Sequence, residues 1–302
     1  GTRGYSDYWI VKIDANGAKV WDKRFGGSQF EYFESVVESS DGGFMITGWT
    51  ESGAGGDKSE AIRGSWDYWT VKVDSNGNKV WDKRFGGRSW DQCNSVIATP
   101  DGGYLLFGFS DSNTVVGDKS EAGQGGKDYW AVKVDADGNK VWDKIFGDTS
   151  YEWGTVAIST ADGGFLLAGF SSELGGVKKD ASRGDSDFGV VKIDADGNRP
   201  LHAIDPDGDV LSWSITGGAD ASKFYLDAST GALSFKPPPP DFENPTDADG
   251  NNTYEVELTV TDPDNLTASK SVTVIVTDVD EAVSPKADFV HKVTPDDGGQ
   301  FG

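Results

Sequence analysis

The chain has 302 residues, a formal net charge of −23 at pH 7, one cysteine (Cys93) and two histidines (His202 and His291). A single cysteine excludes an internal disulfide, and so few thiol and imidazole groups disfavour a zinc site. The acidic surplus disfavours nucleic acid as a partner, because phosphates are bound by basic surfaces, and it favours cations.

The acidic surplus is concentrated in the last third of the chain. Residues 1–199 contain 22 basic and 31 acidic residues, whereas residues 200–302 contain 5 basic and 19 acidic residues. This shift predicts a domain boundary near Pro200. No apolar run is long enough to cross a bilayer, so we expect a protein that does not itself span the membrane.

The first two thirds of the chain contain a repeated stretch. It covers residues 7–27, 67–87 and 128–147, and it returns in shortened form at residues 187–197. The starts of the four copies are 60, 61 and 59 residues apart. A fixed period of this size is typical of stacked supersecondary units.

Each repeat is predicted to form four short strands. In the first copy these are residues 8–13, a strand carrying Trp21 and Phe25, residues 35–37 and residues 44–49. The pair Asn16-Gly17 tolerates the positive φ that a tight hairpin needs. Aromatic and β-branched residues between regularly spaced Gly and Asp predict an all-β fold.

The repeat resembles bacterial β-propeller repeats of the form D-Y/A-x-V-x-K-x-D-x-x-G-x-x-x-W, then F/L-G-G, then D-G-G-Y/F-x-x-x-G. The resemblance covers residues 1–198 and implies a partial β-propeller of three four-stranded blades plus one or two extra strands. Propellers close with four to eight blades. The open edges leave three alternatives: blades that precede Gly1, a fourth blade lost at Pro200, or closure by another chain.

Long loops link the repeats, and part of the loop sequence recurs from one repeat to the next. Residues 57–61 read Asp-Lys-Ser-Glu-Ala, which returns at residues 118–122 and in part at residues 176–181. Repeat loops on one rim often form a binding surface. The alternative, which the sequence favours, is a solvated connection in which charge pairs such as Asp57–Lys58 contribute little.

Two sets of tryptophans recur at fixed repeat positions: Trp9, Trp69 and Trp130, and Trp21, Trp81 and Trp142. Their recurrence in every full repeat indicates packing between neighbouring blades rather than sugar platforms. Trp49 and Trp90 have no tryptophan counterparts in the other repeats. They are therefore the better candidates for ligand binding.

Catalytic patterns are absent from the sequence. The hairpin that starts at Asp14 resembles half of a calcium loop, but it supplies only the first two ligand positions of an EF-hand, so we interpret it as a turn. There is no G-x-S-x-G nucleophile elbow and no phosphate loop. Neither histidine lies in a recurring motif, and we therefore expect no enzymatic activity.

From His202 onward, acidic turns alternate with apolar strands. Strands are predicted at residues 210–215, 224–227, 232–235, 254–260 and 268–276. The two longest alternate apolar and polar residues, which predicts one buried face and a β-sandwich.

These segments resemble a bacterial cadherin-like repeat. The matching motifs are Asp205-Pro-Asp-Gly-Asp209, Asp241-Phe-Glu243, Val260-Thr-Asp262 and Asp278-Val-Asp280-Glu281. The resemblance implies calcium at both ends of the sandwich. Asp205, Asp207 and Asp262 would bind it at the upper end, with Asp209 as an additional candidate, and Asp241, Glu243, Asp278 and Asp280 would bind it at the lower end. Carboxylates suit Ca²⁺, which takes six to eight oxygen ligands. The alternative is a solvated acidic domain.

The acidic module departs from the cadherin-like pattern at its start. Residues 197–202 run directly into the motif at Asp205, so the first strand of such a repeat and its calcium-binding glutamate are missing. The expected domains are residues 1–199 as propeller repeats, residues 200–283 as a cadherin-like β-sandwich, and residues 284–302 as a linker or the start of a further module.

Together these patterns predict a non-catalytic fragment of a large secreted or cell-surface bacterial protein, associated with the membrane surface. Its expected role is calcium-dependent adhesion or scaffolding, with the propeller rim as the binding surface. The expected partners are calcium and either surface glycans or other proteins, but not nucleic acid. The alternative is a carbohydrate-binding region of a secreted polysaccharide-degrading enzyme. An enzyme with its site on the propeller axis would rest on fold analogy alone.

Overall fold

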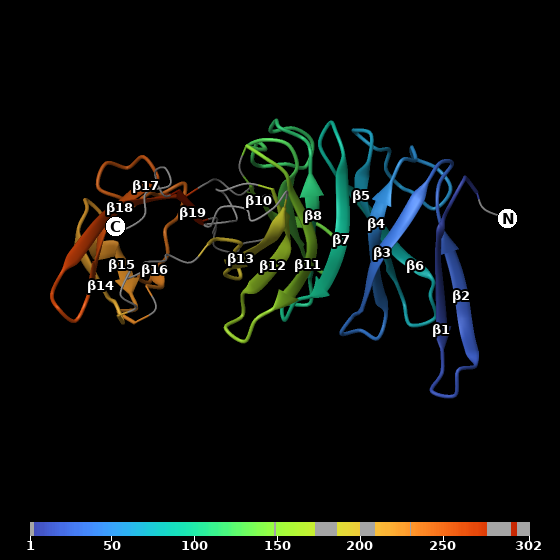
Figure 1. Cartoon of the computed structure of the whole chain (residues 1–302), viewed down its shortest axis with the longest axis horizontal. Coiled ribbons are helices and arrows are strands. Elements are labelled where there is room, and N and C mark those ends of the chain that lie inside the picture. The colour runs from blue at the N-terminus through green and yellow to red at the C-terminus, as the bar shows by residue number, and fades with distance from the viewer. Residues whose placement is uncertain are drawn as a thin grey trace. The chain divides into compact units, whose positions relative to one another are not determined.

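The computed structural model describes residues 3–147, 149–172, 186–199, 209–229 and 231–276, and the backbone of residues 291–294. Within these residues the protein is all-β, with small antiparallel sheets and one short 3-10 helix, Ala221–Lys223. The chain divides into two compact units, the N-terminal unit Gly1–Gly197 and the C-terminal unit Asn198–Gly302. Figure 1 shows both units.

The N-terminal unit consists of short strands joined by turns and loops. The strands are β1 Tyr8–Ile13, β2 Lys19–Phe25, β3 Glu31–Glu38, β4 Phe44–Thr50, β5 Asp67–Val73, β6 Lys79–Phe85, β7 Asp91–Ala98, β8 Tyr104–Ser110, β9 Asp128–Val134, β10 Lys140–Phe146, β11 Glu152–Ser159, β12 Phe165–Ser171 and β13 Asp187–Ile193.

The sheets of this unit do not coincide with the sequence repeats. Strands β3-β4-β5-β6 form one sheet, which joins the last two strands of the first copy to the first two of the second, and β7-β8-β9-β10 form the next in the same way. The pair β1-β2 and the three strands β11-β12-β13 stand at the two ends of the series. The expectation of three four-stranded blades, one for each repeat, was therefore wrong. Among the described strands, two four-stranded sheets straddle the repeat boundaries.

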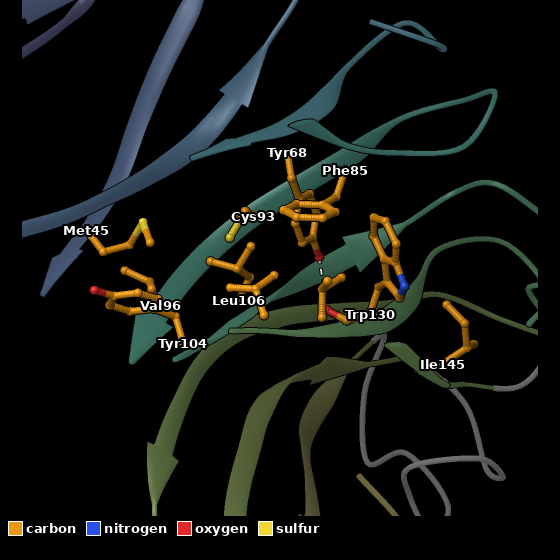
Figure 2. Close-up of a cluster of buried hydrophobic side chains, with 11 residues drawn as sticks. Met45, Tyr68, Phe85, Cys93, Val96, Tyr104, Leu106, Trp130 and Ile145 are labelled. Atoms are coloured by element: carbon orange, nitrogen blue, oxygen red, sulfur yellow. Dashed lines mark hydrogen bonds between the residues drawn. The ribbon is translucent and has the colours of Figure 1, made fainter. Parts of the chain in front are cut away.

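Successive sheets of the N-terminal unit pack face to face in chain order (Figure 1). We call the face toward the following sheet the front face and the opposite one the back face. Figure 2 shows one interface, in which Tyr68 and Phe85 on a front face meet Leu106 and Trp130 on the next back face. Trp69 and Trp130 are fully buried at such interfaces, which confirms the packing role expected for them.

Each interface also carries the same two hydrogen bonds. A tyrosine hydroxyl on the front face donates to a backbone carbonyl of the next sheet, and a tryptophan indole donates to a carbonyl in the next hairpin. The hydroxyl bonds are Tyr8 to Trp69, Tyr68 to Trp130 and Tyr129 to Gly189, each 3.0 Å. The indole bonds are Trp21 to Ser75 at 3.0 Å, Trp81 to Ala136 at 3.2 Å and Trp142 to Ala195 at 3.3 Å.

The hairpins between paired strands use aspartate as turn residue. The Asp14 carboxylate accepts the backbone N–H groups of Asn16 at 2.9 Å and Ala18 at 2.8 Å. Gly17 has a φ of 81°, a conformation that L-residues with side chains rarely adopt. Asp14 therefore acts in turn formation, as the sequence indicated.

The C-terminal unit has a second, independent core. Its strands are β14 Ser212–Gly217, β15 Phe224–Leu226, β16 Leu233–Phe235, β17 Thr253–Thr261, β18 Thr267–Val276 and β19 His291–Thr294. They form the sheet β14-β17-β18-β19 and the pair β15-β16. Trp213, Phe224 and Tyr254 pack with the valines of β17 and β18. Strand β19 lies in the segment for which we expected a linker or a further module.

Candidate functional site

Six aromatic rings form a continuous stack along one edge of the N-terminal unit. This aromatic ladder consists of Tyr5, Phe30, Tyr32, Trp49, Trp66 and Trp90. Neighbouring ring centroids lie 4.0–5.8 Å apart, with interplanar angles of 14–25°. Aromatic pairs in this range stabilise one another beyond the area that they bury.

The strand register explains why these rings meet. Tyr32 on β3 is directly paired with Trp49 on β4, so both side chains lie on the same face. Trp66 immediately precedes β5 and forms a parallel bridge with Trp90, which precedes β7 in the next sheet. The ladder thus crosses from one sheet to the next beside the long loop that begins at Glu51.

Polar groups hold the indole edges of the ladder. The Trp49 indole N–H donates to Glu34 at 3.3 Å, and the Trp66 indole N–H donates to Glu51 at 2.9 Å. The Gln92 amide also donates to Glu34, at 3.4 Å. Burial raises the pKa of the Glu34 carboxyl, so this acid binds its proton more tightly than an exposed glutamate does.

A lysine replaces a ring where the ladder reaches the third sheet. Lys127 occupies the repeat position of Trp66. Its ammonium lies 3.8 Å from the ring centroid of Trp153, 4.4 Å from Phe109 and 5.6 Å from Trp90. Burial lowers the pKa of Lys127. The geometry shows that these rings can hold a cation by cation–π attraction.

The sequence identified only part of this ladder. It singled out Trp49 and Trp90 but missed the other four rings, Tyr5, Phe30, Tyr32 and Trp66. The signal for Trp66 was available, since its counterparts are Ser6, Lys127 and Ser186, none of which is aromatic. Neighbouring rings cover one another's faces inside the ladder, so it presents mainly ring edges to solvent.

The loop that carries Asp57 and Lys58 was expected to be a solvated connection, but it forms bonds to the neighbouring sheet. Asp57 accepts the Gly26 N–H at 3.1 Å and forms an ion pair with Arg3 at 2.7 Å. Lys58 is buried, with its ammonium 4.8 Å above the Trp69 ring. The expectation of a solvated Asp57–Lys58 pair was therefore wrong, because the two side chains diverge into different environments.

The two copies of this buried lysine differ in their partners. The Lys119 ammonium donates to the Ser110 hydroxyl at 2.7 Å and to the Ser112 carbonyl at 2.6 Å. The Lys58 ammonium has no hydrogen-bond partner among the described residues. In the Lys58 copy, Thr50 replaces Ser110 and donates to Glu31 instead, at 2.9 Å. Burial lowers the pKa of Lys58 to about 8.

We expect Lys58→Met to stabilise the protein at pH 7 by about 1–2 kcal/mol, because it removes a buried charge without a hydrogen bond. The matched variant Lys119→Met should destabilise it by about 1 kcal/mol, because it removes two hydrogen bonds. The pKa of Lys58 in the folded state is below its ordinary value of 10.5. The penalty is therefore complete below pH 8 and fades as the pH rises toward 10.5. Urea denaturation at pH 7 and pH 9.5 tests this, and a larger loss for Lys58→Met than for Lys119→Met would contradict it.

Four of the eight acids predicted to bind calcium, Asp205, Asp207, Asp278 and Asp280, lie outside the described residues. The other four, Asp209, Asp241, Glu243 and Asp262, lie in surface loops of the C-terminal unit. Within the described ranges, no group of three or more Asp, Glu, His or Cys side chains is arranged to hold a metal ion.

The sheet topology places the described acids at two opposite ends. Ser212 pairs with Thr261, so Asp209 before β14 and Asp262 after β17 belong to the same end of the sheet. At the other end, the Asn252 amide donates to the carbonyl of Phe242, the residue between Asp241 and Glu243, at 2.9 Å.

The backbone carbonyl of Asn252 in turn accepts the backbone N–H of Val276, the last residue of β18, at 2.9 Å. The loop that carries Asp241 and Glu243 is thereby tied to the point where β18 ends. Asp278 follows Val276 by two positions in the sequence.

The local bonds of Asp241 and Asp262 are compatible with calcium. Asp241 accepts the Glu243 N–H at 3.1 Å, and Asp262 accepts the Leu266 N–H at 2.8 Å, in each case through Oδ1. Each carboxylate keeps a second oxygen that could coordinate a cation. Carboxylate oxygen is the donor type that Ca²⁺ prefers.

In comparisons with known proteins, no family model and no curated sequence matches the chain. Among the residues that the structure describes, no helix has the length and apolar character needed to cross a bilayer.

Proposed function

We propose that the chain is a non-catalytic adhesion or scaffolding segment of a secreted or cell-surface bacterial protein. In this proposal the N-terminal unit is part of a β-propeller, and the C-terminal unit is a cadherin-like sandwich that calcium stiffens. The observation that carries the proposal is the placement of Asp209 with Asp262 at one end of a sheet, and of Asp241 with Glu243 at the other.

Charge supports the same proposal. Residues 200–302 hold 19 acidic residues against 5 basic ones, so acidic loops at one end of the sheet repel one another. A divalent cation between them would relieve this repulsion. When bound, calcium would supply cross-links between loops. The residues of the chain that would hold it are the eight acids named above, of which the structure describes four.

Calcium titration followed by isothermal calorimetry tests the proposal. The chain should bind more than one calcium ion, because acids gather at two ends of the sheet. The absence of saturable heat up to millimolar calcium would contradict it. Lanthanide luminescence provides a second readout that does not depend on the binding enthalpy.

A second candidate function is carbohydrate binding by the N-terminal unit, and the aromatic ladder favours it. Tyr5 at the end of the ladder is 69% exposed, and Trp90 is 41% exposed. The covered faces of the inner rings restrict stacking with a sugar to such positions.

We expect a glycan array probed with the full chain to show binding that is lost in Trp90→Ala, because that residue links the ladder to Lys127. Tyr225→Ala serves as the control, since Tyr225 is an exposed ring in the C-terminal unit. An array without any bound glycan would exclude this second candidate and leave adhesion to protein partners.

A further inference from the structure

The back face of β1 exposes side chains that are buried in every equivalent strand. Trp9 is 68% exposed, and Val11 and Ile13 are also exposed. Their counterparts at the same repeat positions are fully buried, namely Trp69, Val71 and Val73 on β5 and Trp130, Val132 and Val134 on β9. In both of those copies the front face of the preceding sheet covers them.

The other end of the sheet series exposes the complementary face. Phe188 on β13 is 78% exposed, and Val190 and Ile158 on the same front face are exposed as well. Phe188 stands at the repeat position of Tyr8, Tyr68 and Tyr129, each fully buried against the next sheet. The described part of the N-terminal unit therefore ends in one uncovered back face and one uncovered front face.

From this complementarity we propose that the occupant of each face is a second copy of the chain, stacked head to tail. The front face around Phe188 of one copy packs on the back face around Trp9 of the next. Three interfaces inside the chain already join a front face to a back face through equivalent residues, and the new contact continues that series. Such a contact joins two different surfaces, so it generates rings or open arrays rather than a twofold dimer.

The new contact lacks one bond that the internal interfaces possess. The hydroxyls of Tyr8, Tyr68 and Tyr129 donate to a carbonyl of the following sheet. Phe188 has no hydroxyl, so the carbonyl of Trp9 in the next copy receives no such bond. Association between copies is consequently weaker than packing within the chain, and Phe188→Tyr should tighten it by about threefold to tenfold.

Analytical ultracentrifugation of the full chain over a range of concentrations tests the proposal. The wild type should associate with increasing concentration, whereas Trp9→Glu and Phe188→Glu should each remain monomeric. Both substitutions change exposed side chains, so far-UV circular dichroism should be unchanged. Leu266→Glu, at an exposed apolar residue of the C-terminal unit, should associate like the wild type.

Mixing the two charged variants distinguishes head-to-tail packing from other arrangements. Trp9→Glu keeps an intact front face and Phe188→Glu keeps an intact back face, so an equimolar mixture should form one-to-one dimers and stop there. Association of Phe188→Glu alone would indicate that back faces pair with each other and would overturn the proposal. A wild type that stays monomeric at every concentration, with no gain in Phe188→Tyr, would overturn it as well.

Discussion

Replacing Trp130 by alanine should lower the free energy of unfolding of the N-terminal unit by about 3–5 kcal/mol. Trp130 is fully buried and packs with Tyr68, Phe85 and Leu106 in the interface of Figure 2. The substitution would leave a cavity between two sheets that cannot close without moving both. It also removes the indole hydrogen bond to Asp143, which measures 3.0 Å.

Trp9→Ala is the matched control, because Trp9 holds the same repeat position and donates to Asp22 in the same way, at 3.3 Å. Its exposed ring leaves no cavity, so the free energy of unfolding should change by less than about 0.5 kcal/mol. Urea denaturation at a concentration where the chain is monomeric measures both variants. Equal losses for the two variants would show that burial between sheets does not decide the role of this tryptophan.

The sequence predicted the strands and the packing tryptophans well but not the grouping of strands into sheets. Recurrence at a fixed period identified Trp69 and Trp130 as packing residues, but it assigned the same role to Trp9, which is 68% exposed. The start of the recurring stretch suggested the wrong boundaries, because the long connection from β4 to β5 joins two neighbours in one sheet. The short connection from β2 to β3 crosses between sheets instead.

Two glycines, Gly26 and Gly27, allow the short connection from β2 to β3 to cross between sheets. A Cβ at Gly26 would overlap the Asp7 carboxylate, and a Cβ at Gly27 would overlap the Ser52 side chain. The chain can therefore pass close to both groups only with glycine at these positions. The Gly-Gly pair was visible in the sequence, but the side chains that it approaches come from distant positions.

The candidate sites show the same limit. Trp49 and Trp90 stood out because they break the repeat, whereas Tyr32 joins the ladder only through the pairing of β3 with β4. Likewise, the recurring Asp-Lys-Ser motif did not reveal that Lys58 is buried, nor that Asp57 is not its partner. Contacts between residues far apart in the sequence decide both cases.

Calcium should raise the melting temperature of the C-terminal unit by about 10 °C or more. Calcium at 100 times the dissociation constant of one site adds about 2.7 kcal/mol to the stability of the folded state. In a domain of this size, each 1 kcal/mol shifts the melting temperature by about 4–8 °C. The N-terminal unit has a separate core and should melt at an unchanged temperature, which provides an internal reference.

Asp262→Asn should remove part of this calcium-dependent gain. Asparagine can still accept the Leu266 N–H through its own Oδ1, so the turn should persist without calcium, while one ligand charge is lost. Asp264→Asn is the matched control, because Asp264 is an exposed acid two positions away and outside the predicted ligand set. The same loss in both variants would indicate a general charge effect rather than coordination.

Differential scanning calorimetry of the full chain, with millimolar calcium and then with excess chelator, is the most direct test of calcium binding by the C-terminal unit. We predict two transitions, of which only the one belonging to the C-terminal unit moves to higher temperature with calcium. Superimposable scans in calcium and chelator would show that the acidic loops do not bind the ion and would contradict the proposed calcium-stiffened scaffold.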